Sequence, residues 1–284
     1  MIDTTSTRDT FHGTIVPRYT DLDTWRHVNN SRAYQLHLEA RMTAHVARFG
    51  PDAWFSDAER LRPLRTITQF RQVSWYGRNI DFTVQVLACD TDTYRLRSEL
   101  YQGGTHVGTQ ECLMGAFLDH ERVALPDAVR DSLGRDVLAD PELLPPETYS
   151  ELATDLSRFP LSQQLTPRYA DLDADSQRGE AAIARYMEQA RFGAIRRIDL
   201  KGLGILIAGM DMTFRHYRPG WKPVDIAAGV SRTGNTSFHL TGGAASADGI
   251  HAVANSIMVQ VDKETTRPTP LTEDVRRQLD DLSI

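Results

Sequence analysis

The heptapeptide PRYTDLD at residues 17–23 returns with one substitution as PRYADLD at residues 167–173. An ungapped alignment of residues 16–41 with residues 166–191 gives 8 identical pairs out of 26, where chance gives roughly one or two. The identities lie at the two ends of the unit, in PRYxDLD and in the Ala-Arg pairs at residues 40–41 and 190–191. The chain is therefore predicted to be a duplicated domain whose two copies diverged at the centre of the repeated segment.

Each copy continues into a segment with helical periodicity. Apolar residues recur every three or four positions there, which predicts one long helix with an apolar stripe. We expect the side chain of Asn29 or Asn30 to cap the first helix, and that of Asp175 or Ser176 to cap the second. The predicted stripes consist of Tyr34, Leu38, Met42 and Val46 in the first copy and of Ile183, Met187, Ala190, Ala194 and Ile198 in the second.

The period shifts toward two after each helix, which predicts a meander of four strands in each copy. These strands are expected at residues 67–76, 80–88, 94–101 and 106–118, and at residues 205–217, 224–231, 237–245 and 251–261. A helix with an apolar side is best buried against such a sheet. The predicted fold class is therefore α+β, with two tandem units that each wrap a curved antiparallel sheet around a long central helix.

Domain boundaries follow from composition. Residues 125–155 are charged and rich in proline and lack strand alternation, although a short helix is expected at residues 127–133. We predict a first domain at residues 1–135, a linker at 136–158 and a second domain at 159–284, which ends in a short helix at residues 271–282.

Composition excludes several classes of protein. The chain has 40% hydrophobic and 25% charged residues and a net charge of -6, which indicates a soluble globular protein and argues against nucleic acid as a partner. No apolar run has membrane-spanning length and no secretory signal is visible, so we expect a cytoplasmic protein with no membrane partner. Cys89 and Cys112 have no metal-ligand spacing and are expected to be buried free thiols, although a catalytic role for Cys112 stays open. No metal site is predicted.

The first copy resembles a known signature. RYTDLDTWRHVNNSRAYQLHLEAR, residues 18–41, is similar to the pattern RYxDxDxxxHVNNxxYxxYxExAR of hotdog-fold thioesterases, which include 4-hydroxybenzoyl-CoA, acyl-CoA and acyl-ACP thioesterases. RYADLDADSQRGEAAIARYMEQAR, residues 168–191, keeps both ends and loses HVNN. The resemblance implies a tandem double-hotdog chain with its substrate cleft between the two units. It also implies that two chains associate as a homodimer, and that no cofactor is needed apart from the coenzyme A that the substrate carries.

The same resemblance suggests catalytic residues. Thioester hydrolysis needs a carboxylate that activates water or attacks the carbonyl, together with donors that stabilise the developing oxyanion. Asp23 matches the family's catalytic Asp, although it could merely cap the helix, and Asp21 is expected to be a structural loop residue. His27 is either an acid-base group or a polar surface residue, and Asn29 either orients Asp23 or only caps the helix.

Substrate-binding residues are expected around the start of the first helix. Free amides from Val28 to Asn30 are candidate oxyanion donors, and Asn30 could contact the pantetheine arm. Glu39 is either a substrate contact or an ordinary surface charge, and Tyr34 is a candidate for closing the acyl cleft. Trp25 departs from the acyl-ACP thioesterases, which carry Asn at that position.

The second copy is predicted to be a structural or altered site. Asp173 is retained and Asp175 is new in the loop, but QRGE at residues 177–180 replaces HVNN. Arg71, Arg215 and Arg218 could contact phosphates of coenzyme A, but single arginines on strands are more often surface charges.

These features together predict an acyl-CoA thioesterase of fatty acid metabolism that releases free acid and coenzyme A. Two alternatives stay open, a non-catalytic acyl-CoA binding or sensor protein and an acyl-ACP thioesterase. A hotdog dehydratase would need Asp, Asn-Pro and His in the loop-helix segment, and that combination does not occur here. The sequence does not predict the acyl group.

Overall fold

The computed structural model describes residues 6–7, 10–51, 59–138, 143–149, 151 and 155–284. The chain divides into two compact units, Met1–Pro145 and Pro146–Ile284. The predicted linker, residues 136–158, falls on both sides of this division, and its residues 139–142, 150 and 152–154 lie outside the described residues. Tyr149 from this segment is buried in the second unit, where its hydroxyl donates a hydrogen bond to Asp211 Oδ1 (2.8 Å).

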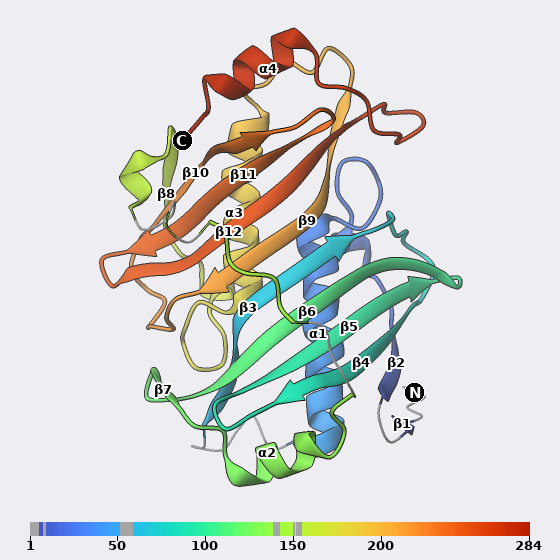
Figure 1. Cartoon of the computed structure of the whole chain (residues 1–284), viewed down its shortest axis with the longest axis vertical. Coiled ribbons are helices and arrows are strands. Elements are labelled where there is room, and N and C mark those ends of the chain that lie inside the picture. The colour runs from blue at the N-terminus through green and yellow to red at the C-terminus, as the bar shows by residue number, and fades with distance from the viewer. Residues whose placement is uncertain (1–5, 8–9, 52–58, 139–142, 150, 152–154) are drawn as a thin grey trace. The chain divides into compact units, whose positions relative to one another are not determined.

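The first unit combines one long helix with an antiparallel sheet whose strand order is β1-β2-β4-β5-β6-β3, and β7 pairs with β6 (Figure 1). Its helices are α1 (Asn30–Phe49) and α2 (Asp127–Gly134). Its strands are β1 (Ser6–Thr7), β2 (Thr10–Ile15), β3 (Arg60–Phe70), β4 (Ile80–Cys89), β5 (Thr93–Gln102), β6 (Thr105–Leu118) and β7 (Glu121–Val123).

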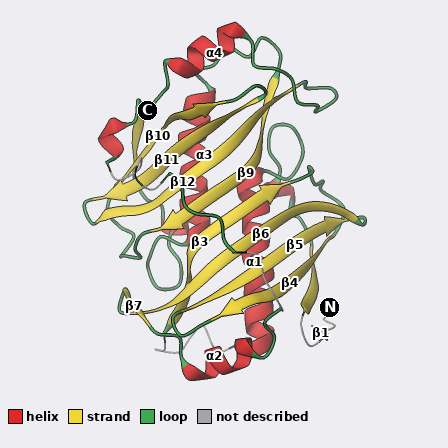
Figure 2. Ribbon diagram, in the orientation of Figure 1, coloured by secondary structure: helices red, strands yellow, loops and turns green. Residues whose placement is uncertain are grey.

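The second unit repeats this plan with the strand order β8-β10-β11-β12-β9. Figure 2 shows the same combination of helix and sheet in each unit. Its helices are α3 (Glu180–Ile195) and α4 (Glu273–Asp280). Its strands are β8 (Leu161–Leu165), β9 (Gly204–Phe214), β10 (Val224–Thr233), β11 (Ser237–Ser246) and β12 (Gly249–Val261). The predicted α+β class is confirmed.

Two strands differ from the prediction by three or more residues at an end. β3 begins at Arg60, seven positions before the predicted start, and ends at Phe70 rather than Tyr76. β9 ends at Phe214 rather than Tyr217. The start of β3 was missed because its residues RLRPLRT, 60–66, carry three arginines and a proline instead of an alternating pattern.

The buried face of α1 also differs from the predicted stripe. Leu38 and Met42 are only partly buried and Val46 is 36% exposed, whereas Tyr34 and His37 are buried. Polar groups on the sheet explain why Tyr34 and His37 are buried, because a buried polar side chain needs a hydrogen-bond partner. The Tyr34 hydroxyl lies 3.3 Å from Thr66 Oγ1, and His37 Nδ1 lies 2.8 Å from Ser98 Oγ. In the second unit, by contrast, the whole predicted stripe is buried, although its last residue, Ile198, lies beyond the end of α3.

The Ala-Arg pairs shared by the two copies have the same place in both units. Arg41 is 2% exposed and Arg191 is 5% exposed. Each guanidinium donates to a methionine sulfur of its own unit, Met114 for Arg41 and Met210 for Arg191. Burial lowers the pKa of Arg191 to about 10. The identity at these positions therefore preserves a buried contact between helix and sheet.

Candidate active site

The first candidate site is built on a tight loop that leads into α1. An isolated bridge between Leu22 and Val28 closes the loop. Within it, the Asp23 amide donates to the His27 carbonyl (3.0 Å), and the Arg26 amide donates to the Asp23 carbonyl (3.1 Å). Arg26 has a φ of 67°, a left-handed conformation that lets the chain reverse within a few residues. The reversal brings Asp23 and His27 to the same side of the loop.

The Asp23 carboxylate is held by its own loop. Its Oδ1 accepts the Trp25 amide (2.8 Å), and its Oδ2 lies 3.0 Å from His27 Nδ1. Burial alone would raise the pKa of Asp23, but the hydrogen bonds from His27 and from the Trp25 amide outweigh it and lower the pKa. Asp23 is therefore a carboxylate at neutral pH, and the adjacent imidazole is oriented by it.

The His27 imidazole is packed between aromatic rings. Its side chain is 12% exposed and both ring nitrogens are buried; apart from the Nδ1 contact with Asp23, neither has a hydrogen-bond partner among the described residues. The rings of Trp25 and Trp75 lie with their centroids 6.1 and 6.2 Å from that of His27, both edge to face. Gln102 fixes Trp75 through hydrogen bonds to its amide and its carbonyl, each 2.8 Å long. Trp75 and Gln102 are not among the site residues predicted from the sequence.

The start of α1 corrects the predicted oxyanion donors. The Val28 amide donates to the Ser74 carbonyl (2.8 Å), and the Asn29 amide donates to the Asp21 carbonyl (2.8 Å). These two amides are therefore already occupied, and the prediction that they are free is wrong. Both amides are occupied because a buried backbone N–H must form a hydrogen bond, and nearby backbone carbonyls provide the acceptors. Asn30, the first residue of α1, is half-buried.

Three of the other predicted residues support the local structure or pack against it, and one is exposed. Asn29 caps α1, since its Oδ1 accepts the amide (2.7 Å) and the hydroxyl (2.8 Å) of Ser31. Tyr34 is fully buried between helix and sheet, and Glu39 is exposed on α1. Asp21 accepts the Arg18 amide at 2.7 Å, which fits its predicted role in the loop.

The second unit repeats the loop without the imidazole. A bridge between Leu172 and Arg178 closes it, and the Asp173 amide donates to the Gln177 carbonyl (2.8 Å). Asp173 Oδ1 accepts the amides of Asp175 and Gln177, both at 3.0 Å. The buried Gln177 takes the place of His27, so Asp173 has no histidine in that position. The predicted capping of α3 by Asp175 or Ser176 is wrong, because the N-cap is Gly179, which makes no side-chain hydrogen bond.

The three candidate phosphate contacts differ in their surroundings. Arg71 is exposed and donates to Gln69 Oε1, and Arg215 is paired with Glu147 at 2.8 Å. Arg218 lines a small cavity in the second unit together with Arg178. The sequence analysis names Arg178 only as part of the substituted QRGE segment. Its neighbours in the cavity, His216 and His251, are distant in sequence, so no local pattern marks the cluster.

Other features of the described residues bear on the chemistry. Cys112 is a buried free thiol, as predicted, whereas Cys89 is only partly buried. Among the described side chains, no group of three or more His, Cys, Asp or Glu residues is arranged to hold a metal ion. In the part of the chain that the structure describes, no helix is long and apolar enough to cross a membrane.

Solved structures show what the fold is similar to. No protein-family model matches the chain, and no curated protein sequence matches it. A 12:0-ACP thioesterase from Umbellularia californica aligns over 88% of this chain and 94% of its own, with a TM-score of 0.70 and 14% identity. An acyl-ACP thioesterase from Bacteroides thetaiotaomicron aligns over 88% and 97%, with a TM-score of 0.66 and 11% identity.

A third structure is similar over even more of the chain. A Lactobacillus plantarum protein provisionally described as an oleoyl thioesterase aligns over 93% of this chain and 97% of its own, with a TM-score of 0.73 and 11% identity. The fold of this chain is therefore shared with these three structures. Identities this low concern the fold, so the chemistry must be argued from the site.

Proposed function

We propose that this protein is an acyl thioester hydrolase composed of two tandem hotdog units. The observation that carries the proposal is the 3.0 Å contact between Asp23 Oδ2 and His27 Nδ1 at the start of α1. A histidine oriented by a carboxylate is a general base suited to neutral pH. The fold also supports the proposal, because three solved structures that share it are named as thioesterases.

His27 is proposed as the base and Asp23 as its partner. The carboxylate holds the imidazole in the tautomer in which Nδ1 carries the proton, which leaves the Nε2 lone pair as the proton acceptor. Because Nε2 is buried beside Trp25 and Trp75, the mechanism requires these rings to shift so that water reaches it. Water then attacks the thioester carbonyl, and the imidazolium returns the proton to the departing thiolate. Asp23 itself is a weaker base because its pKa is lowered. In the alternative mechanism, Asp23 itself activates water or attacks the thioester carbonyl directly.

The favoured substrate is an acyl-CoA, from which the enzyme would release free acid and coenzyme A. An acyl-ACP is the second candidate, since two of the structures with this fold are named as ACP thioesterases. No cofactor is needed for the proposed chemistry beyond the coenzyme A that the substrate brings.

A thiol-release assay tests this function. We expect purified protein to release thiol from at least one member of a panel of acyl-CoAs of increasing chain length, and more slowly from the matched acyl-ACPs. Faster turnover of acyl-ACPs would reverse the choice of carrier. Tight binding of acyl-CoA without thiol release at any chain length would instead favour the non-catalytic sensor.

A further inference from the structure

The second unit buries an arginine where the first unit has Val28. Arg178 is 3% exposed. One terminal nitrogen donates to His251 Nε2 (2.8 Å), and the other donates to the Lys222 carbonyl. Its Nε is buried without a hydrogen-bond partner among the described residues. The guanidinium is thus held in place, but one of its donors is unused.

No carboxylate within the described residues forms an ion pair with Arg178. The groups that favour its charge are the Tyr186 hydroxyl, which also makes a side-chain hydrogen bond with it, and Asp248, which already pairs with Lys222 Nζ at 2.5 Å. Burial lowers the pKa of Arg178 despite this favourable field. Its direct partners among the described residues are thus neutral groups, and a buried charge without a directly paired anion is costly.

The neighbouring histidine does not supply the missing negative charge. A guanidinium can only donate, so His251 Nε2 must be the acceptor and cannot carry a proton. The same nitrogen lies 2.8 Å from Ser246 Oγ. Burial and the Arg178 charge lower the pKa of His251 to about 3. His251 is therefore neutral and does not compensate the positive charge of Arg178.

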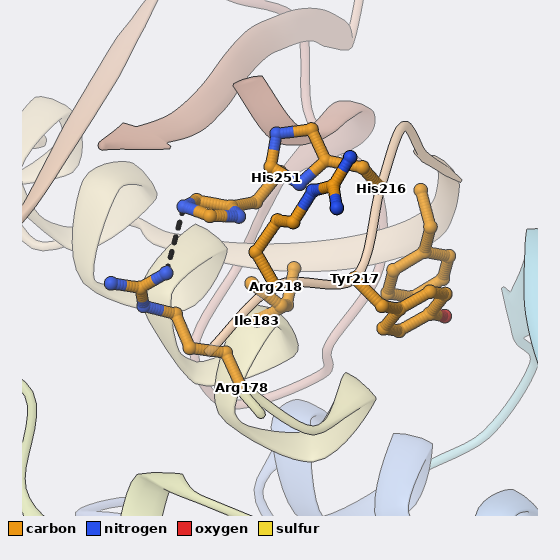
Figure 3. A pocket seen from close by; sticks show the side chains of 7 residues that line it. Arg178, Ile183, His216, Tyr217, Arg218 and His251 are labelled. Atoms are coloured by element: carbon orange, nitrogen blue, oxygen red, sulfur yellow. Dashed lines mark hydrogen bonds between the residues drawn. The ribbon is translucent and has the colours of Figure 1, made fainter. Parts of the chain in front are cut away.

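A small cavity adjoins this cluster. It measures about 10 Å³ and is lined by Arg178, Arg218, His216 and His251 on its polar side, and by apolar side chains that include Ile183. In Figure 3 the Arg178 guanidinium points toward His251, and His216 and Arg218 lie beside that pair. Both ring nitrogens of His216 are buried. Such a space admits about one water-sized particle, which is also the size of a halide ion but smaller than phosphate.

We infer that the second unit contains a binding site for one small monovalent anion of the size of chloride, seated in this cavity against Arg178. The site occupies the part of the repeat in which the two copies diverged. It does not depend on the proposed hydrolase activity, because none of its residues belongs to the Asp23 loop. Its contribution would be to stabilise the second unit by neutralising a buried charge.

Thermal unfolding in potassium chloride and in potassium gluconate of equal ionic strength tests this site. An anion that binds only the folded state raises its stability with concentration. Wild-type protein should therefore melt about 3 °C higher for each tenfold rise in chloride above the dissociation constant. Gluconate, which is too large for the cavity, should give no such rise.

Variants separate binding from general salt effects. Arg178→Met should lose the difference between chloride and gluconate, whereas Arg232→Met, which removes an exposed arginine of the same unit, should keep it. An equal chloride response in wild type and Arg178→Met would overturn the proposal, as would stabilisation by phosphate or acetate but not by chloride. Crystals of the wild type soaked in bromide give a readout that does not need the variant to fold. An anomalous peak beside Arg178 is expected, and its absence would refute the site.

Discussion

The Asp23→Asn variant should hydrolyse acyl thioesters about 10² to 10⁴ times more slowly than the wild type, which is the usual contribution of a positioned acid-base group. The amide keeps the shape of the side chain and can still accept the Trp25 amide. It cannot hold the imidazole in the required tautomer or stabilise the imidazolium that forms. The measurement is kcat and KM for thiol release with the best acyl-CoA, and the loss should appear in kcat.

Asp173→Asn is the matched control, because Asp173 occupies the same loop position in the second unit. Its carboxylate accepts two loop amides and has Gln177 where Asp23 has His27. We expect this variant to keep activity within about twofold of the wild type, since exchanges away from the chemistry have small effects. A larger loss from Asp173→Asn than from Asp23→Asn would place the chemistry in the second unit.

His27→Gln distinguishes the two possible bases. The substitution reproduces in the first unit what Gln177 already is in the second. If His27 is the base, the variant should lose as much activity as Asp23→Asn, and the double variant should lose little more, because residues that act as a unit are not additive. Near-normal activity of His27→Gln together with an inactive Asp23→Asn would instead assign the base to Asp23.

The parts of the site that are close in sequence could be predicted, and the distant parts could not. Asp23 and His27 are four residues apart in one local motif, which names both as site residues, although the partner expected for Asp23 was Asn29. The Ser74 carbonyl, which takes the Val28 amide, and the Gln102 side chain, which fixes Trp75, come from other parts of the first unit. No periodicity or motif marks such contacts, so two of the three predicted oxyanion donors, the amides of Val28 and Asn29, proved to be occupied.

The fold shows the same division between local and distant information. The repeat and the period of each segment predicted the order of helices and strands, because both signals are local. The buried face of α1 could not be predicted from hydrophobicity, since His37 is buried only because Ser98 on β5 offers it a partner. Arg178 is the corresponding case in the second unit, where His251 on β12 determines how a charged residue is accommodated.

The Asp171→Asn variant should lose about 2 kcal/mol of unfolding free energy at pH 7. Asp171 is 3% exposed and anchors the loop that precedes α3. Its carboxylate receives hydrogen bonds from Arg168 (3.0 Å), Arg185 (3.2 Å) and the Tyr186 hydroxyl (3.1 Å). Burial would raise its pKa, but these partners outweigh burial and lower the pKa from 3.8 to about 2. Urea unfolding of both proteins at pH 7 measures the difference.

The stability difference between wild type and Asp171→Asn should decrease as pH falls. A carboxylate whose pKa is lower in the folded state stabilises the protein fully above its unfolded pKa, and that contribution is lost as pH falls through the folded value. The gap between wild type and Asp171→Asn should therefore be constant from pH 7 to about pH 5 and fall to about half by pH 3. Asp21→Asn, in the matching but less buried loop of the first unit, should cost less. A gap for Asp171→Asn that does not change with pH would mean that the carboxylate charge is not what holds the loop.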